Sequence, residues 1–223
     1  SLATQGSRDF EVLVYDDGSD PEQLASMRRE IQTLGPAANV TCFLRHERSY
    51  PQNVHDGHPG FGQWSRMFNT LFPRSKGQIV GILASDWRLA PDFIEVIGEN
   101  LRSLTPGNMI FGDRSKQGET KHAFPPGATT GAYRIERFDS ADTGFQHFLW
   151  RKDWRAWDES FDALGGWHAF PYWLAETWCA GVAFWVCLDL HADEAAHPNP
   201  AAFIDQVHAS TPYYIGRIKQ LGF

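Results

Sequence analysis

Short apolar runs alternate with amphipathic segments along the first half of the chain. We expect the runs to form buried strands, and the segments, in which apolar residues recur at helical spacing, to form helices. The expected strands cover residues 10–15, 40–44, 78–84 and 109–112, and the expected helices cover 21–34, 64–72 and 91–104. Strands and helices that alternate in this way form a mostly parallel sheet with helices on both faces. The sequence therefore predicts an α/β fold.

Acidic residues follow the first of these strands. The turn reads Asp16-Asp17-Gly18-Ser19, and ligands of parallel sheets bind beyond the carboxyl ends of the strands. A carboxylate there can accept hydrogen bonds from a nucleobase or a ribose hydroxyl, and Gly18 permits a tight turn beside a ligand. The same residues also suit an ordinary strand-to-helix turn in which Ser19 or Asp20 caps the helix.

A candidate metal site comes from residues that lie far apart in the sequence. Asp86 follows the strand expected at 78–84, and hard divalent cations prefer such oxygen ligands. His191 and His197 lie in a polar segment after the last apolar run, and either imidazole could complete a site with Asp86. Each residue also has an ordinary interpretation, because Asp86 can cap the helix that begins near Pro91 and a lone histidine is commonly a solvated loop residue.

The second half of the chain is less regular. We expect strands at 132–138 and 182–188, helices at 146–154 and 170–180, and a short helix near 201–209. Most tryptophans lie between Trp150 and Trp185, where flat aromatic faces can pack in a core or stack on a ligand. Since no repeat or linker divides the chain, the sequence predicts one domain over residues 1–223.

Charge and composition argue against several classes of protein. The net charge of −7 disfavours a nucleic-acid partner held by a basic surface. No apolar run approaches the roughly 18 residues of a transmembrane helix, and none has the flanks of a signal peptide. The three cysteines lack a metal-binding or redox spacing, which is typical of a reducing compartment. We therefore expect a cytoplasmic location, alone or at the cytoplasmic face of a membrane.

Three motifs follow one another along the chain: residues 9–20 with Asp-Asp-Gly-Ser, residues 60–69, and residues 77–93 with Ala-Ser-Asp and Leu-Ala-Pro-Asp-Phe. In order and spacing they resemble the motifs of family 2 glycosyltransferases, which have the GT-A fold. A weaker similarity continues through 157–161 and Gly165-Gly166. The resemblance implies that residues 1–112 bind a nucleotide and that 113–223 bind an acceptor. It implies a metal-dependent, inverting transfer of a sugar from a nucleotide-diphosphate sugar, UDP-linked by the habit of the family, to a hydroxyl acceptor.

The resemblance also implies roles for individual residues. Asp17 would contact the nucleobase from a turn that Asp16 supports, and Asp86 would hold Mn²⁺ or Mg²⁺ on the diphosphate. His191, or else His197, would be the distal metal ligand. The remaining candidates for nucleotide binding are Gln63, Arg66, Asn69 and Ser85.

Two departures from the family pattern leave the catalytic base open. The metal-binding element reads Ala84-Ser85-Asp86, with one carboxylate fewer, and Trp167-His168 stands where an acidic pair commonly supplies the base. His168 could be the base, with Glu159 and Asp162 as alternatives, or catalysis could be lost. A non-catalytic relative that binds a sugar or a nucleotide is therefore an alternative function. A sugar nucleotidyltransferase is a third, but the basic glycine-rich loop that it needs is missing from the sequence.

A further departure lies at the start of the chain. Family members have a strand and a helix before the first motif, about 20–25 residues together, and residues 1–5 resemble only the end of that helix. We expect that the chain is truncated, that another segment supplies this element, or that the sheet is rearranged.

Overall fold

The computed structural model describes residues 2–16, 19–34, 39–45, 64–83, 87–103, 106–113, 115–116, 119–120, 132–134, 147–164, 168–194 and 211–223. The chain forms two compact units that interleave along the sequence. Unit 1 comprises Ser1–Phe10, Gly77–Trp154 and Thr177–Ala196, and unit 2 comprises Glu11–Lys76, Arg155–Glu176 and His197–Phe223. The single domain over 1–223, divided at residue 112, stays a prediction. Among the described residues, none of the helices has both the length and the apolar character that a membrane crossing requires.

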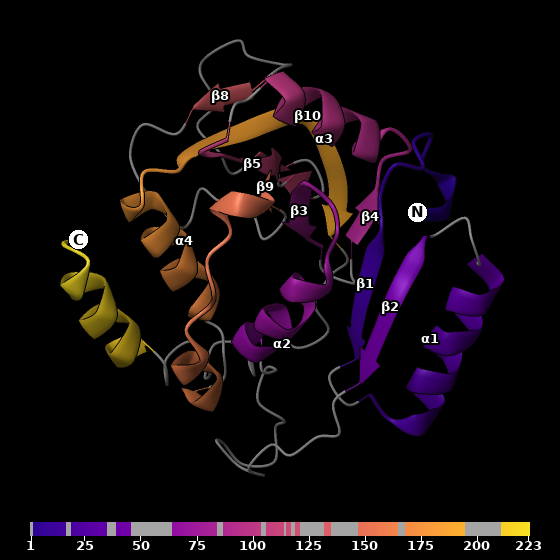
Figure 1. Ribbon diagram of the computed structural model, residues 1–223, viewed down its shortest axis with the longest axis horizontal. Coiled ribbons are helices and arrows are strands. Elements are labelled where there is room, and N and C mark those ends of the chain that lie inside the picture. The colour runs from indigo at the N-terminus through magenta and orange to yellow at the C-terminus, as the bar shows by residue number, and fades with distance from the viewer. Residues whose placement is uncertain are drawn as a thin grey trace. The chain divides into compact units, whose positions relative to one another are not determined.

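In unit 2, β1 (Val12–Asp16) and β2 (Val40–Arg45) form a parallel pair, with α1 (Pro21–Leu34) running alongside (Figure 1). The helix α1 begins at an Asp cap, because Asp20 Oδ1 accepts the N–H groups of Glu22 and Gln23 at 3.0 and 2.8 Å. The Arg28 guanidinium lies 5.7 Å above the Phe43 ring and joins α1 to β2. The strand–helix–strand order expected at the start of the chain is confirmed.

Aromatic side chains hold together the other helices that the structure describes in unit 2. It contains α2 (Trp64–Leu71), η3 (Phe72–Arg74), η5 (Glu159–Leu164), most of α4 (Ala169–Cys179) and a helix over 211–220. Trp157 lies at the centre, with ring centroids 4.7 Å from Phe68 and 5.3 Å from Trp173. Because Trp157 and Trp173 are 2% and 0% exposed, these tryptophans form core rather than ligand surface.

Unit 1 is built on a six-stranded sheet in the order β3-β9-β5-β10-β4, with β8 also pairing β10. The strands are β3 (Ile79–Ile82), β4 (Trp87–Leu89), β5 (Asn108–Asp113), β8 (Ala132–Arg134), β9 (His147–Trp150) and β10 (Ala183–Glu194). The helix α3 (Phe93–Ser103) lies against this sheet (Figure 1), and Phe93, Ile97, Ile110 and Phe148 form a buried cluster between them. The described part of unit 1 also contains short elements: η1 (Leu2–Thr4), η4 (Arg151–Asp153) and the two-residue strands β6 (Ser115–Lys116) and β7 (Glu119–Thr120).

The helix expected at 146–154 is wrong, because His147–Trp150 form the strand β9 and Arg151–Asp153 a single 3-10 turn. The side chains of His147, Phe148 and Leu149 are all buried, since β9 lies between β3 and β5. A strand covered on both faces shows no polar alternation, so its sequence does not differ from that of a buried helical turn. Since β9 is antiparallel to both neighbours, the sheet is mixed, and the described parallel pairs are β1–β2 and β5–β10.

The other expected elements of the second half agree with the structure where it describes them. The strand expected at 182–188 is β10, and the helix expected at 170–180 is α4. The strand expected at 132–138 is present as β8 over its first residues. The short helix near 201–209 lies outside the described residues.

The start of the chain forms one 3-10 turn and docks on α3 within unit 1. The buried side chain of Gln5 donates from Nε2 to the Ala90 carbonyl at 2.7 Å and accepts the Ile94 N–H at Oε1 at 3.0 Å. Gln5 thereby caps the first turn of α3 from a distant part of the sequence.

Candidate functional site

Asp16 ends β1, at the carboxyl end of the parallel pair in unit 2. Its side chain is 3% exposed, and its Oδ1 accepts the Ser19 N–H at 3.0 Å. This bond joins the end of β1 to the residue before the Asp20 cap of α1. Asp17, the predicted nucleobase contact, lies outside the described residues, as do Gln63 and Ser85.

Asp162 caps the amino end of α2. Its Oδ1 accepts the Ser65 N–H and its Oδ2 the Arg66 N–H, both at 3.0 Å. These N–H groups are the free donors in the first turn of a helix, where negative charge is also favoured. Burial raises the pKa of the Asp162 carboxyl, although the bonds from Arg66 and Ser65 oppose that shift. Asp162, one of the predicted alternatives for the catalytic base, thus stabilises the start of helix α2. This helix carries Arg66 and Asn69, two of the predicted nucleotide ligands.

Asn69 is bound to the segment that precedes η5. Its Nδ2 donates to the Trp157 carbonyl at 2.9 Å and to Glu159 Oε1 at 3.0 Å, and its Oδ1 accepts the Trp157 N–H at 2.8 Å. The structure therefore brings Asn69, Glu159, Arg66 and Asp162 together in unit 2. The Asn69 amide joins α2 to the 157–159 backbone, and its contact with a nucleotide stays a proposal.

His168 lies immediately before α4 and is 8% exposed. Its ring stacks on Tyr214 of the 211–220 helix, with centroids 4.7 Å apart and an interplanar angle of 24°. Its carbonyl accepts the Tyr172 N–H at 3.1 Å in the first turn of α4. Burial lowers the pKa of the imidazole below its ordinary value of 6.5, so the ring is neutral at pH 7 and can accept a proton.

The predicted metal ligands are described only in part. Asp86 and His197 lie outside the described residues, and the backbone of His191 lies in β10, in register with Asp113 of β5. Further along β10, Glu194 pairs with Trp87, the first residue of β4, which follows Asp86 directly in the sequence. The strand that carries His191 is therefore hydrogen-bonded to the strand that follows Asp86. Over the residues that the structure describes, three or more His, Cys, Asp or Glu side chains do not converge anywhere as a metal cluster would require.

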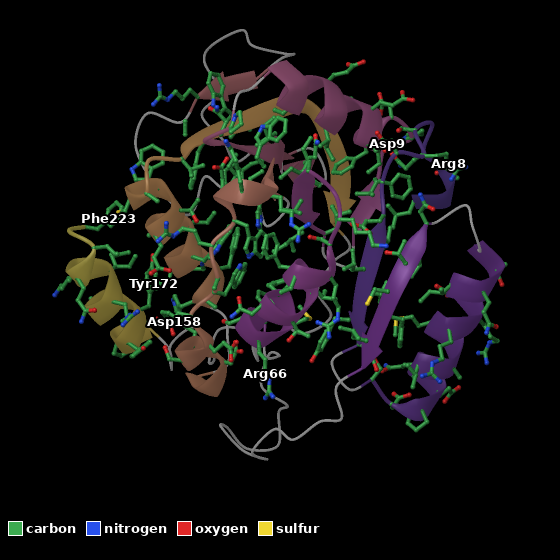
Figure 2. The ribbon with its side chains drawn as sticks, viewed as in Figure 1. Arg8, Asp9, Arg66, Asp158, Tyr172 and Phe223 are labelled. Atoms are coloured by element: carbon green, nitrogen blue, oxygen red, sulfur yellow. The ribbon has the colours of Figure 1, made fainter. Side chains whose placement is uncertain are left out.

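One group of interacting residues near His168 was not predicted from the sequence. Arg217 of the 211–220 helix donates from Nη2 to Asp158 Oδ2 at 2.8 Å and to the Tyr172 hydroxyl at 3.0 Å. Asp158 and Tyr172 both lie beside this helix (Figure 2). The spacing of Tyr213 and Arg217 could have indicated this group, because residues four apart lie on one face of a helix.

No protein-family model and no curated protein matches this chain. Several solved structures match it, as follows. A crystal structure of S. aureus TarS 1–349 in complex with UDP matches 93% of this chain and 57% of TarS 1–349, with a TM-score of 0.58 and 13% identity. A crystal structure of GalNAc-T7 with UDP, GalNAc and Mn²⁺ matches 94% of this chain and 45% of its own, with a TM-score of 0.57 and 13% identity.

A third match is the mannosyltransferase PcManGT from Pyrobaculum calidifontis, solved in complex with GDP-Man and Mn²⁺. It covers 98% of this chain and 67% of its own, with a TM-score of 0.50 and 15% identity. This chain thus spans little more than half of TarS 1–349 and less than half of GalNAc-T7. At such low identity the likeness concerns the fold, and the chain has the GT-A-type α/β fold that its motifs predict.

Proposed function

We propose that this protein is a glycosyltransferase that moves a sugar from a nucleotide-diphosphate sugar to a hydroxyl acceptor with inversion. The observation that carries this proposal is the match, over more than nine-tenths of the chain, to TarS with UDP and to GalNAc-T7 with UDP and Mn²⁺. It is supported by the buried carboxylate of Asp16 at the end of β1, because ligands of such sheets bind beyond the strand ends. A UDP-linked donor is the first choice, and the GDP-Man of PcManGT is the reason to test GDP-linked sugars as well.

The nucleotide would bind at the turn after β1. Asp16 fixes this turn through its bond to the Ser19 N–H, so that Asp17 can accept hydrogen bonds from the base. Arg66 and Asn69 on α2, with Gln63 and Ser85, are the other proposed nucleotide ligands.

Asp86, with His191 or His197, would hold a divalent cation. Carboxylate and imidazole are ligands that Mn²⁺ accepts, and the pairing of β4 with β10 brings the residue after Asp86 beside the strand of His191. These residues therefore fit Mn²⁺, or Mg²⁺ with the carboxylate as the main ligand. A cation bound there would neutralise charge on the departing nucleoside diphosphate.

His168 is the proposed general base. Its neutral imidazole can take the proton of the acceptor hydroxyl as that oxygen attacks the anomeric carbon. Glu159 and Asp162 are weaker candidates, because the first accepts a bond from Asn69 and the second caps α2.

Thermal unfolding with UDP, GDP and Mn²⁺, separately and together, tests the binding step. We expect UDP with Mn²⁺ to raise Tm, since a ligand that binds only the folded state stabilises it. Asp86→Asn should remove the effect of Mn²⁺, whereas Asp92→Asn, a matched change at an exposed carboxylate, should keep it. If no nucleotide raises Tm with or without Mn²⁺, the proposal fails.

A second candidate is a relative that binds a nucleotide sugar without transferring it. This candidate is supported by two of the predicted site residues that form hydrogen bonds within the protein. Asp162 accepts the N–H groups at the start of helix α2, and Asn69 binds the Trp157 backbone. This candidate predicts that UDP binds while no UDP or GDP is released from UDP- or GDP-linked sugars. Nucleotide release that requires both His168 and Asp86 would exclude it.

A further inference from the structure

The 211–220 helix contacts the segment 158–168 of unit 2 through three side chains on adjoining faces. Tyr213 shares a 2.6 Å hydrogen bond with the Ser160 hydroxyl, and its ring meets Phe161 edge to face at 5.0 Å. Tyr214 stacks on His168. Arg217, one turn beyond Tyr213, binds Asp158. The 211–220 helix therefore contacts the part of the chain that contains Glu159, Asp162 and His168.

Arg217 connects three elements at once. Its Nη2 reaches both Asp158 and the Tyr172 hydroxyl, and its guanidinium lies 5.0 Å above the Tyr172 ring. Tyr172 is 3% exposed, whereas the side chains of Arg217 and Asp158 are 33% and 21% exposed. Hydrogen bonds to a charged group are stronger than neutral ones, so the guanidinium binds the Tyr172 hydroxyl more firmly than a neutral donor would.

His168 is held by the 211–220 helix along two routes. The first is direct, through the Tyr214 ring. The second runs through Arg217, which binds the Tyr172 hydroxyl, while the Tyr172 N–H donates to the His168 carbonyl at 3.1 Å. The side chain of His168 therefore contacts this helix, and Arg217 of the same helix contacts the first turn of α4, which begins directly after His168.

We propose that Tyr214 and Arg217 are positioning residues that set the imidazole of His168 for proton abstraction from the acceptor. This role rests on the proposed function, in which His168 is the base. Neither residue is a catalytic residue, because each acts through His168. A misplacement of about 1 Å can lower the rate of a catalysed step by about a hundredfold, so removing either contact lowers kcat more than it weakens donor binding.

Substitutions at Tyr214 and at Arg217 test the two routes to His168 separately. Tyr214→Phe keeps the ring that stacks on His168, and Tyr214→Ala removes it. Arg217→Lys keeps a positive charge that can reach Asp158, and Arg217→Gln removes it. The matched control is Lys219→Gln, which removes one positive charge from an exposed position of the same helix.

The measurements are Tm, the Kd of UDP with Mn²⁺, and kcat for nucleotide release from UDP- and GDP-linked sugars, with water as the acceptor. We expect Tyr214→Ala and Arg217→Gln to lower kcat by about tenfold to a hundredfold, with the Kd of UDP within about twofold of wild type. Tyr214→Phe and Arg217→Lys should recover most of the rate, and Lys219→Gln should match wild type.

A pH profile adds a readout that loss of folded protein does not move. The titratable groups on and beside the elements around His168 are Asp158, Glu159, Asp162, Tyr172, Glu176, Cys179, Tyr213, Tyr214, Arg217 and Lys219. The lowered pKa of His168 comes from burial. Tyr214→Ala exposes the ring, so the acid limb of kcat/KM should move to higher pH, while Tyr214→Phe should keep it in place.

The outcomes distinguish this inference from the proposed function. If wild type releases nucleotide and Tyr214→Ala and Arg217→Gln are as active as Lys219→Gln, only the positioning role is overturned. The same holds if kcat falls merely in proportion to the folded fraction, with an unmoved acid limb. If wild type neither binds UDP nor releases nucleotide from any donor, the proposed function is overturned, and the positioning role with it.

Discussion

Asn69 and Trp157 are joined by a reciprocal pair of hydrogen bonds between the α2 side chain and the backbone before η5. The Asn69 Nδ2 donates to the Trp157 carbonyl at 2.9 Å, and the Trp157 N–H donates to Asn69 Oδ1 at 2.8 Å. Trp157 is 2% exposed, so water is a poor substitute for Asn69 as the hydrogen-bond partner of these two backbone groups. An amide at position 69 therefore fixes the segment that carries Glu159.

Asn69→Ala should lower the free energy of unfolding by about 1–3 kcal/mol, because it leaves the Trp157 backbone groups unpaired in a buried place. Urea denaturation measures the change. Asn100→Ala is the control, since the Asn100 amide donates to the Val96 carbonyl within its own helix, and it should lower stability less. If Asn69→Ala left stability intact but removed UDP binding, the side chain would serve the ligand and not the fold.

Asp162→Ala should lower the free energy of unfolding by about 1–2 kcal/mol, the usual effect of losing a helix cap. The two N–H groups of Ser65 and Arg66 lose their acceptor, and helix α2 loses the negative charge at its amino end. Asp20→Ala removes the cap of α1 at an exposed position and should have a smaller effect, because water replaces the lost acceptor. Equal stability of Asp162→Ala and wild type in urea would show that the carboxylate does not act as a cap.

Local sequence patterns predicted the strands and helices of the first half because each has its own period and end signals. Pro21 and Asp20 mark the start of α1, and the apolar residues from Leu24 onward give its buried side. The pattern failed at β9, where His147, Phe148 and Leu149 are buried in a strand between β3 and β5 and show no polar alternation. Only its partners β3 and β5, distant in the sequence, decide that this run is a strand.

The candidate site was predictable to the extent that its residues lie in motifs. Asp16 stands at a strand end because the motif places it there, and its bond to Ser19 is local. The bonds from Asp162 to the start of α2 and from Arg217 to Asp158 join residues that are far apart in the sequence. No local pattern encodes such contacts, and the capping role of Asp162 therefore became visible only in the folded chain.

The stability of the protein should fall below pH 6.5 in part because of His168. Burial lowers its pKa in the folded state, so the unfolded state binds more protons between the folded pKa and 6.5. The contribution of His168 is complete above pH 6.5 and is lost as the pH falls through the folded pKa. His168→Gln should flatten the rise of the free energy of unfolding between pH 5 and 7, measured by urea denaturation at each pH. Tyr214→Ala should flatten it too, and a slope unchanged in both variants would contradict this linkage.

Gly81 and Gly216 should respond in opposite directions to the same added methyl group. A Cβ at Gly81 of β3 would overlap the Phe148 ring of β9 and come within 2.9 Å of the His147 carbonyl oxygen, whereas a Cβ at Gly216 meets no atom within 4 Å. Gly81→Ala should therefore lower the free energy of unfolding by about 1–3 kcal/mol through overpacking. Gly216→Ala should raise it by about 0.5–1 kcal/mol, because alanine restricts the unfolded chain and favours a helix.

Urea denaturation of both glycine variants checks this contrast, and a double variant identifies its cause. Phe148→Leu removes the ring atoms that the new methyl group would meet, so Gly81→Ala should cost less in that background than in the wild type. The same loss in both backgrounds would show that the approach of the His147 carbonyl oxygen, and not the Phe148 ring, excludes a methyl group at position 81. That result would overturn the explanation through the Phe148 ring, whose carbon atoms are the nearest to the added methyl group.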